Sequence, residues 1–149
     1  MWTDALLAYL HYAALFALIG FLAIEWNLLR TGAPALDLNR LARIDALFGL
    51  SAGLVLLTGA ARAVYGLKGW SFYAHNPVFH LKIGLFVLVG LISIAPTLAF
   101  LRWRKAQRAD PAFRVPDAQW RRARLLVIVE LHLLALIPLA AVVMARGLR

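Results

Sequence analysis

Four long apolar stretches occupy most of this chain of 149 residues. They run over residues 5–29, 44–64, 78–101 and 125–145, and a helix needs roughly 20 mostly apolar residues to cross a bilayer core about 30 Å thick. Only helices and closed barrels satisfy all of their backbone hydrogen bonds in lipid. We therefore predict an all-α fold, an integral membrane four-helix bundle that forms a single transmembrane domain over residues 1–149.

The basic residues are unequally divided between the two ends of the predicted helices. The chain has 16 Lys and Arg residues and a net charge of +9. Eleven of these basic residues lie in or beside the connections that follow the first and third stretches, and basic residues favour cytoplasmic loops. We therefore expect both termini to face outward (N-out/C-out), in a multi-pass protein of the bacterial inner membrane. Because the charges adjoin membrane segments, membrane lipids are the expected partners and nucleic acid is not.

Ionisable side chains interrupt the apolar stretches. Each costs about 2.5–3.5 kcal/mol at the centre of a bilayer, so such groups should face one another, a cofactor or water. They are His11, Glu25, Arg62, Lys82, Glu130 and His132. The function should therefore be sought among these six residues and their neighbours.

Two histidines near the outward surface suggest a haem. His11 lies early in the first stretch and His80 early in the third, so they have similar depths in the predicted topology. Two neutral imidazoles on neighbouring helices can ligate a haem b iron, and Arg62, Lys68 and Lys82 at the same level can neutralise its propionates. The chain has no cysteine, which excludes thiolate ligation and covalent c-type haem attachment. In the alternative interpretation, each histidine only bonds to backbone or water.

Helical geometry leaves the relation between His80 and Lys82 open. One face of the third stretch carries Lys82, and His80 points roughly to the opposite side. The other members of the Lys82 face are Phe86, Val89, Ser93 and Pro96 or Thr97. Either the long Lys82 side chain only extends to the surface, or it faces the bundle and binds an anion while His80 faces lipid or a neighbouring subunit of a homo-oligomer.

Acidic residues gather near the cytoplasmic ends of the predicted helices. Glu25, Glu130 and Asp45 occupy the same layer, and Arg43 lies beside Asp45 in the sequence. Structural ion pairing is one interpretation of this layer. The other is a proton-transfer route, in which Glu25, Glu130 and His132 carry protons between the cytoplasm and the outward site.

Small residues in the second stretch predict close helix packing. Gly49 and Gly53 have the small-xxx-small spacing that lets another backbone approach. We therefore expect this helix to be the packing centre of the bundle.

The region from Arg43 to Trp103 carries a further set of distinctive residues. They are Arg62, Lys68-Gly69, Phe72-Tyr73, Asn76-Pro77, Phe79, Lys82, Phe86, Ser93, Pro96-Thr97 and Arg102-Trp103. With Glu25 in the first stretch, this pattern resembles the bacterial membrane family called domain of unknown function 2214. That resemblance implies a fold but no activity.

A shorter pattern resembles a second group of proteins. Leu10-His11-Tyr12, Gly69-Trp70 and Phe79-His80-Leu81-Lys82 are similar to motifs of the small haem-containing protoporphyrinogen oxidase of bacteria, the HemJ type, and of CopD-like copper-resistance membrane domains. In that group the first-helix histidine ligates haem. The resemblance therefore implies that His11 is the leading haem ligand.

Two functions of different classes follow. The first is a haem b-binding redox protein, cytochrome b-like or protoporphyrinogen-oxidase-like, that passes electrons between a quinol or porphyrinogen-like reductant and an acceptor. The second is a non-enzymatic accessory subunit or small transporter. It would bind an anion or a lipid headgroup in an outward pocket made by Arg62, Lys68, Tyr73, Asn76 and Lys82.

Overall fold

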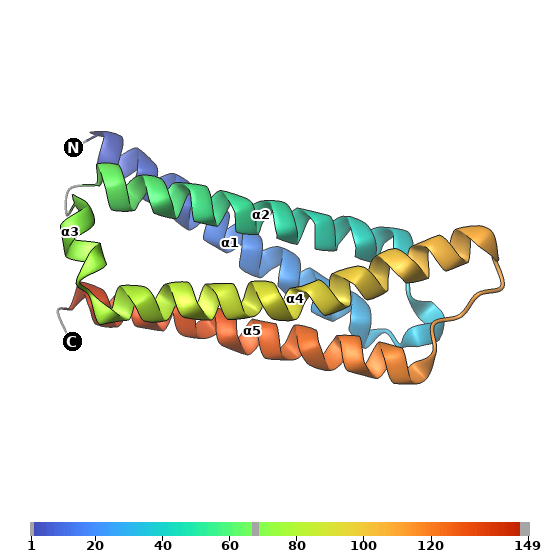
Figure 1. Cartoon of the computed structure of the whole chain (residues 1–149). Coiled ribbons are helices and arrows are strands. Elements are labelled where there is room, and N and C mark those ends of the chain that lie inside the picture. The colour runs from blue at the N-terminus through green and yellow to red at the C-terminus, as the bar shows by residue number, and fades with distance from the viewer. Residues whose placement is uncertain (1, 67–68, 147–149) are drawn as a thin grey trace.

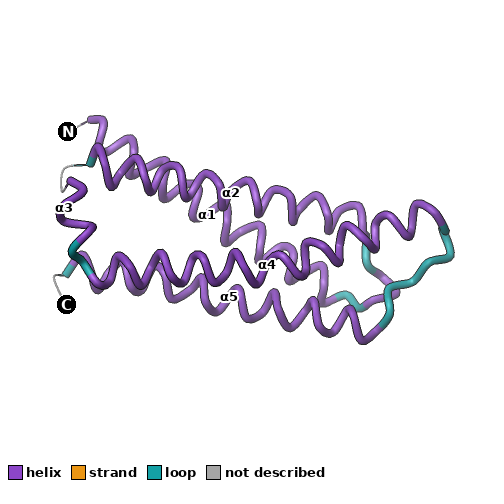
Figure 2. The backbone as a smooth tube through the Cα atoms, viewed as in Figure 1, coloured by secondary structure: helices purple, strands orange, loops and turns teal. Residues whose placement is uncertain are grey.

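The protein is a bundle of long helices, described here by a computed structural model over residues 2–66 and 69–146. The long helices are α1 (Trp2–Arg30), α2 (Leu38–Tyr65), α4 (Pro77–Ala109) and α5 (Asp117–Ala145). A short helix, α3 (Gly69–Ala74), joins α2 to α4, and a 3-10 turn (Ala33–Ala35) follows α1 (Figure 1). Within these described residues the structure contains no strand, so the all-α prediction is confirmed (Figure 2).

The two ends of the bundle differ in their connections. At one end, which we call the terminal end, α1 begins, α5 ends and α3 lies (Figure 1). At the other, which we call the loop end, residues 31–37 join α1 to α2 and residues 110–116 join α4 to α5. The terminal end corresponds to the predicted outward side.

The four predicted spans are present, but the helices are longer than their apolar cores. α2 begins at Leu38 rather than at residue 44, α4 ends at Ala109 rather than at residue 101, and α5 begins at Asp117 rather than at residue 125. Hydropathy marks the part of a helix that lipid can surround, whereas backbone hydrogen bonding continues into polar turns. At Leu38 the extension starts from a side-chain cap, because the Asp37 carboxylate accepts a hydrogen bond from the Arg40 backbone N–H at 3.0 Å.

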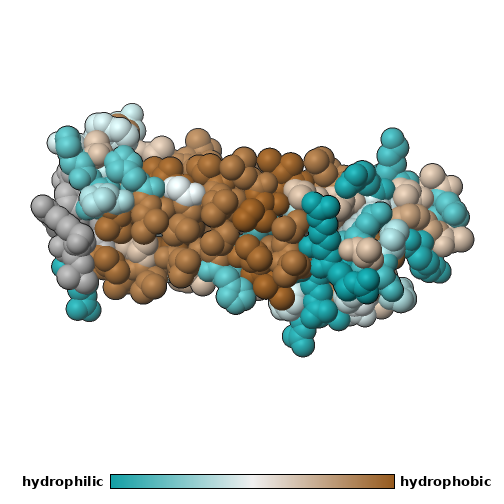
Figure 3. Space-filling model, turned by 60° about the horizontal axis from the view of Figure 1, so that its bottom comes forward, coloured by the Kyte–Doolittle hydropathy of each residue, from teal (hydrophilic) through white to brown (hydrophobic). Residues whose placement is uncertain are grey.

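The surface matches that of a membrane-spanning protein. All four long helices are long and apolar enough to cross a bilayer. Hydrophobic residues form a broad belt between hydrophilic ends, and the loop end is the more strongly hydrophilic in this view (Figure 3). Side chains such as Phe16, Leu57 and Leu91 are largely exposed on this surface, at 74%, 69% and 62%, which suits contact with lipid and not with water.

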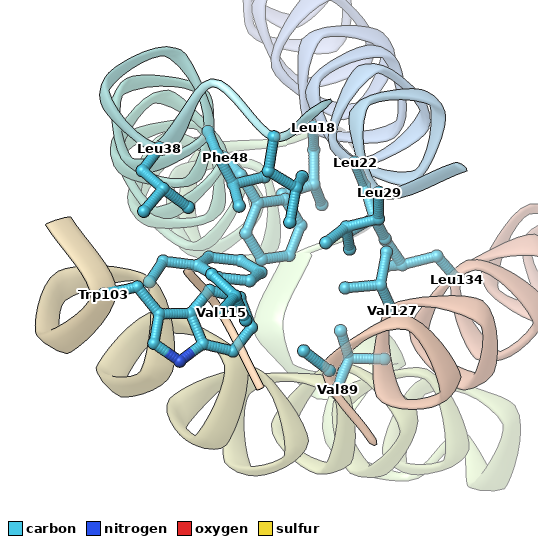
Figure 4. Close-up of a cluster of buried hydrophobic side chains, with 14 of the residues drawn as sticks. Leu18, Leu22, Leu29, Leu38, Phe48, Val89, Trp103, Val115, Val127 and Leu134 are labelled. Carbon is cyan, nitrogen blue, oxygen red and sulfur yellow. The ribbon is translucent and has the colours of Figure 1, made fainter. Parts of the chain in front are cut away.

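The interior is made by side chains from all four long helices. Leu22, Phe48, Val89 and Val127 are buried together, one from each helix (Figure 4). Val115, from the loop between α4 and α5, joins the same cluster at the loop end. These contacts fix the rotation of each helix and thereby decide which polar side chains meet inside.

Helices α1 and α2 approach each other closely at Gly59, and not at Gly49 or Gly53 as predicted. A Cβ added to Gly49 or Gly53 would have no other atom within 4 Å, so these two glycines do not mark the tight contact. A Cβ on Gly59 would instead lie 3.2 Å from Cε1 of His11. The prediction for Gly49 and Gly53 was wrong because the small-residue spacing does not say which face of α2 meets α1.

Candidate functional site

His11 lies half-buried against α2, near the terminal end. Its Nδ1 is 3.0 Å from the Thr58 hydroxyl, and that hydroxyl donates to the Leu54 carbonyl at 2.6 Å. Since the Thr58 proton is used in this way, the hydroxyl oxygen accepts from His11 Nδ1–H. The neutral His11 ring therefore carries its lone pair on Nε2, the tautomer that a metal ligand or proton acceptor needs.

Two cations from different helices accompany His11. Arg62 lies one turn beyond Thr58 on α2, and Lys82 lies on α4; the charges of both act on the His11 ring. The Arg62 guanidinium stacks over Tyr12, with its carbon 5.4 Å from the ring centre. Its Nε is buried and has no hydrogen-bond partner within the described part of the chain. We call His11, Arg62 and Lys82 the cationic site.

The remaining predicted members of the outward pocket have other contacts. Asn76 caps α4, its side chain accepting from the backbone N–H groups of Val78 at 2.9 Å and Phe79 at 3.3 Å. Tyr73 packs its ring against Phe79, with ring centres 5.2 Å apart. Lys68 lies outside the described residues. Asn76 and Tyr73 therefore support the start of α4, on which Lys82 is carried.

His80 does not join the cationic site. It is exposed, and its Nε2 donates to the Ala74 carbonyl of α3 at 2.9 Å. Lys82, two residues further along α4, is the residue whose charge acts on His11. The structure thus leaves His80 exposed, whereas half-buried Lys82 and Arg62 lie near enough for their charges to act on His11, as the helical geometry of the third stretch suggested.

The acidic side chains meet toward the loop end. Glu25 of α1, Asp45 of α2 and Glu130 of α5 are all buried, with exposed fractions of 1%, 6% and 1%. Thr97 of α4 donates from its hydroxyl to Asp45 Oδ1 at 2.8 Å. We call Glu25, Asp45, Glu130 and Thr97 the acidic cluster. Arg43 is exposed and forms no ion pair with Asp45, so the structural ion pairing considered for this layer is not found among these residues.

His132 lies apart from the acidic cluster. It is exposed on α5, and its Nδ1 donates to the Ile128 carbonyl of the same helix at 2.7 Å. Two residues along a helix correspond to a rotation of about 200°, so His132 and the buried Glu130 face nearly opposite sides. The structure therefore brings Glu25 and Glu130 together but does not bring His132 to them.

The sequence reasoning missed two hydroxyl groups that complete these sites. Thr58 orients His11 and Thr97 binds Asp45, and each contact joins residues about 50 positions apart. One available signal was the spacing of Thr58 and Arg62, which are four residues apart and so share a helical face. The second signal was helical spacing in the third stretch, which puts Thr97 on the same face as Lys82. In the structure this face is directed into the bundle at Val89 and Thr97.

The comparisons with known proteins agree with the fold. A family model described as "Predicted membrane protein (DUF2214)" matches residues 3–149, so the chain belongs to this family. No curated protein and no solved structure matches the chain. The similarity to HemJ-type and CopD-like proteins therefore stays a prediction.

Proposed function

We propose that this member of a membrane family binds an anionic group, a carboxylate or a phosphate, at the cationic site on its terminal end. The observation that supports the proposal is the buried, unpartnered Nε of Arg62. A buried donor on a charged group without an acceptor is strongly unfavourable, and an anion is the ligand that relieves it. A lipid phosphate in the bilayer or a carboxylate of a small molecule would supply the same oxygen acceptors.

Each residue of the cationic site would make a different contact with the bound anion. Arg62 offers a planar guanidinium whose orientation is held by Tyr12, which suits two parallel hydrogen bonds to one anion. Lys82 adds a second charge from α4, and neutral His11 presents an acceptor, Nε2, to a protonated oxygen of the ligand.

A binding measurement with matched charge variants tests this proposal. Arg62→Gln and Arg102→Gln each remove one positive charge from a spanning helix, but Arg102 is exposed on α4 and donates to the Leu98 carbonyl. Protein in nanodiscs of neutral lipid would be titrated with inorganic phosphate and, separately, with phosphatidylglycerol. We expect Arg62→Gln to weaken binding roughly ten- to hundredfold, since hydrogen bonds to charged groups contribute about 1.5–3 kcal/mol, and Arg102→Gln to have little effect.

The two titrations also distinguish the sources of the anion. Binding of phosphatidylglycerol without phosphate would identify a lipid headgroup, and binding of both would identify a small-anion site. Equal losses in the two variants would mean that only general electrostatic attraction is measured, and the proposal would be rejected.

Haem b is the second candidate ligand, and the tautomer of His11 favours it. Nε2 of His11 is the nitrogen that does not face Thr58, and Arg62 and Lys82 would meet the haem propionates, which are themselves carboxylates. The pair His11 and His80 does not fit as two axial ligands in this arrangement, because His80 bonds to Ala74. Haem would supply one-electron chemistry, with a quinone or porphyrin as a proposed partner in the bacterial inner membrane.

An optical spectrum of the purified protein, as isolated and after dithionite, tests the haem candidate. A Soret band that His11→Ala abolishes and His80→Ala preserves would support a haem held by His11. A colourless folded protein from haem-replete cells would eliminate haem and leave the anion proposal intact.

A further inference from the structure

The acidic cluster at the loop end is separate from the cationic site and concerns a different ligand. Three carboxyl groups, from α1, α2 and α5, are buried in the interior of the bundle, and the one on α2, that of Asp45, accepts a hydrogen bond from the Thr97 hydroxyl of α4. Glu25 and Glu130 are each 1% exposed. Each of the four long helices contributes one residue to the acidic cluster, so the packing of the whole bundle holds the cluster in position.

The carboxyl groups of this cluster lack hydrogen-bond donors and positively charged neighbours. Oε2 of Glu25 and Oε1 of Glu130 are buried and accept no hydrogen bond in the described part of the structure. The charge of Asp45 acts on both of these glutamates, and that of Glu130 acts on Glu25. Within residues 2–66 and 69–146, no Lys or Arg forms an ion pair with any of the three.

The guanidinium of Arg124 contacts aromatic rings and not the carboxyl groups of the cluster. Arg124 of α5 lies between two indole rings, with its guanidinium carbon 5.0 Å from the ring centre of Trp26 and 5.5 Å from that of Trp120. Trp26 follows Glu25 directly in the sequence, but Arg124 contacts its ring and not the carboxylate. The negative charge of the cluster is therefore not balanced by a residue of the described chain.

Three buried carboxylates without a counter-charge cannot all be ionised. Placing one isolated charge in an apolar interior is strongly unfavourable, and two more charges of the same sign beside it add repulsion. Some cation must therefore occupy the cluster. Among the described residues no three acidic or histidine side chains are arranged to hold a metal ion, which leaves the proton.

A route by which protons can reach the cluster begins at Thr97. Thr97 and Ser93 line a cavity of about 80 Å³ between α1, α2 and α4. A water molecule needs roughly 10–15 Å³ of such space, so the cavity has room for several. Its other walls include Leu18, Phe48 and Val89, which converge from three helices (Figure 4). Water at these two hydroxyls would connect to Asp45 through the hydroxyl of Thr97.

We propose that Glu25, Asp45 and Glu130 form a buried proton-binding site, which exchanges protons through Thr97 with water in the adjoining cavity. Protons are carried on the carboxyl groups themselves, so that the number of negative charges in the interior is reduced. The site is independent of anion binding at the terminal end. It requires no electron transfer and no further reactant.

Infrared spectroscopy tests the proposal directly, because a protonated carboxyl group has a C=O stretch that a carboxylate lacks. The protein in nanodiscs should show this band at neutral pH, with the shift in D₂O expected of an exchangeable proton. Glu25→Gln and Glu130→Gln should each reduce the band and leave the fold intact, since glutamine has the shape of the protonated acid. Asp117→Asn, at the exposed start of α5, is the matched control and should leave the band unchanged.

Thermal unfolding of the wild-type protein gives a second readout that does not depend on the variants. Stability should fall as the pH is raised from about 4 to above neutral, because the unfolded chain loses its glutamate protons near pH 4 whereas the folded protein keeps them. Absence of the protonated band at neutral pH in the wild type would overturn the proposal. So would a melting temperature that rises with Na⁺ relative to choline in the wild type but not in Glu25→Gln, since that result would identify an alkali cation as the occupant.

Discussion

The hydrogen bond between Thr97 and Asp45 gives the sharpest test of how the acidic cluster is held together. Thr97→Val replaces the hydroxyl that lies 2.8 Å from Asp45 Oδ1 with a methyl group of similar size, so the main loss is one donor to a buried carboxyl group. In proteins generally, leaving such a group unsatisfied costs about 1–3 kcal/mol. Hydrogen bonds between membrane helices have measured contributions of about 0.6 kcal/mol on average and at most about 1.7 kcal/mol. We therefore expect Thr97→Val to lower the free energy of unfolding by about 1–2 kcal/mol.

The assay is unfolding by SDS from mixed micelles, followed by tryptophan fluorescence. Ser93→Ala is the matched control, because the Ser93 hydroxyl lies on the same face of α4 but donates to the Gly90 carbonyl of its own helix at 2.9 Å. A double-mutant cycle with Asp45→Asn isolates the pair. If Thr97→Val costs no more than Ser93→Ala and the cycle shows no coupling, the bond does not stabilise the cluster and the reasoning is refuted.

Three further predictions address other contacts. Gly59→Ala should lower the melting temperature relative to Gly53→Ala, since only the first Cβ would crowd the His11 ring, at 3.2 Å; equal melting temperatures would contradict this packing. Trp120→Phe should cost about 1 kcal/mol in SDS unfolding, because the indole N–H donates at 3.0 Å to the carbonyl at the end of α1, and no cost would show that this bond is unimportant. His132→Leu should change the stability by less than about 0.5 kcal/mol, because this side chain is exposed and its Nδ1 donates to a carbonyl of its own helix; a large loss would point to a contact with another subunit.

The spanning helices could be predicted from the sequence because lipid imposes one simple requirement on length and hydropathy. The helix ends were less accurate, since hydropathy does not register capping groups such as Asp37. The short helix α3 was missed because its six residues, in a segment rich in Gly and aromatic side chains, have neither the length nor the periodicity of a helix signal.

Prediction of the sites was limited by the rotation of each helix. Spacing along one helix correctly separated His80 from Lys82, because the angle per residue is constant. It could not say that Thr58 of α2 meets His11 of α1, since that depends on how two helices turn toward each other. The same limit applies to Asp45, whose sequence neighbour Arg43 suggested an ion pair, although the structure exposes Arg43 and buries Asp45.

The two sites have opposite charge, but they are too far apart to neutralise one another. His11 and Glu25 lie on one helix 14 residues apart, which corresponds to about 21 Å of rise. Two unit charges at that distance attract by only about 0.8 kcal/mol at an effective dielectric constant of about 20. The cost of removing each ion from water is several kcal/mol. Each site therefore has to be balanced locally, which is why we infer an anion beside Arg62 and protons on Glu25 and its neighbours as two separate ligands of one bundle.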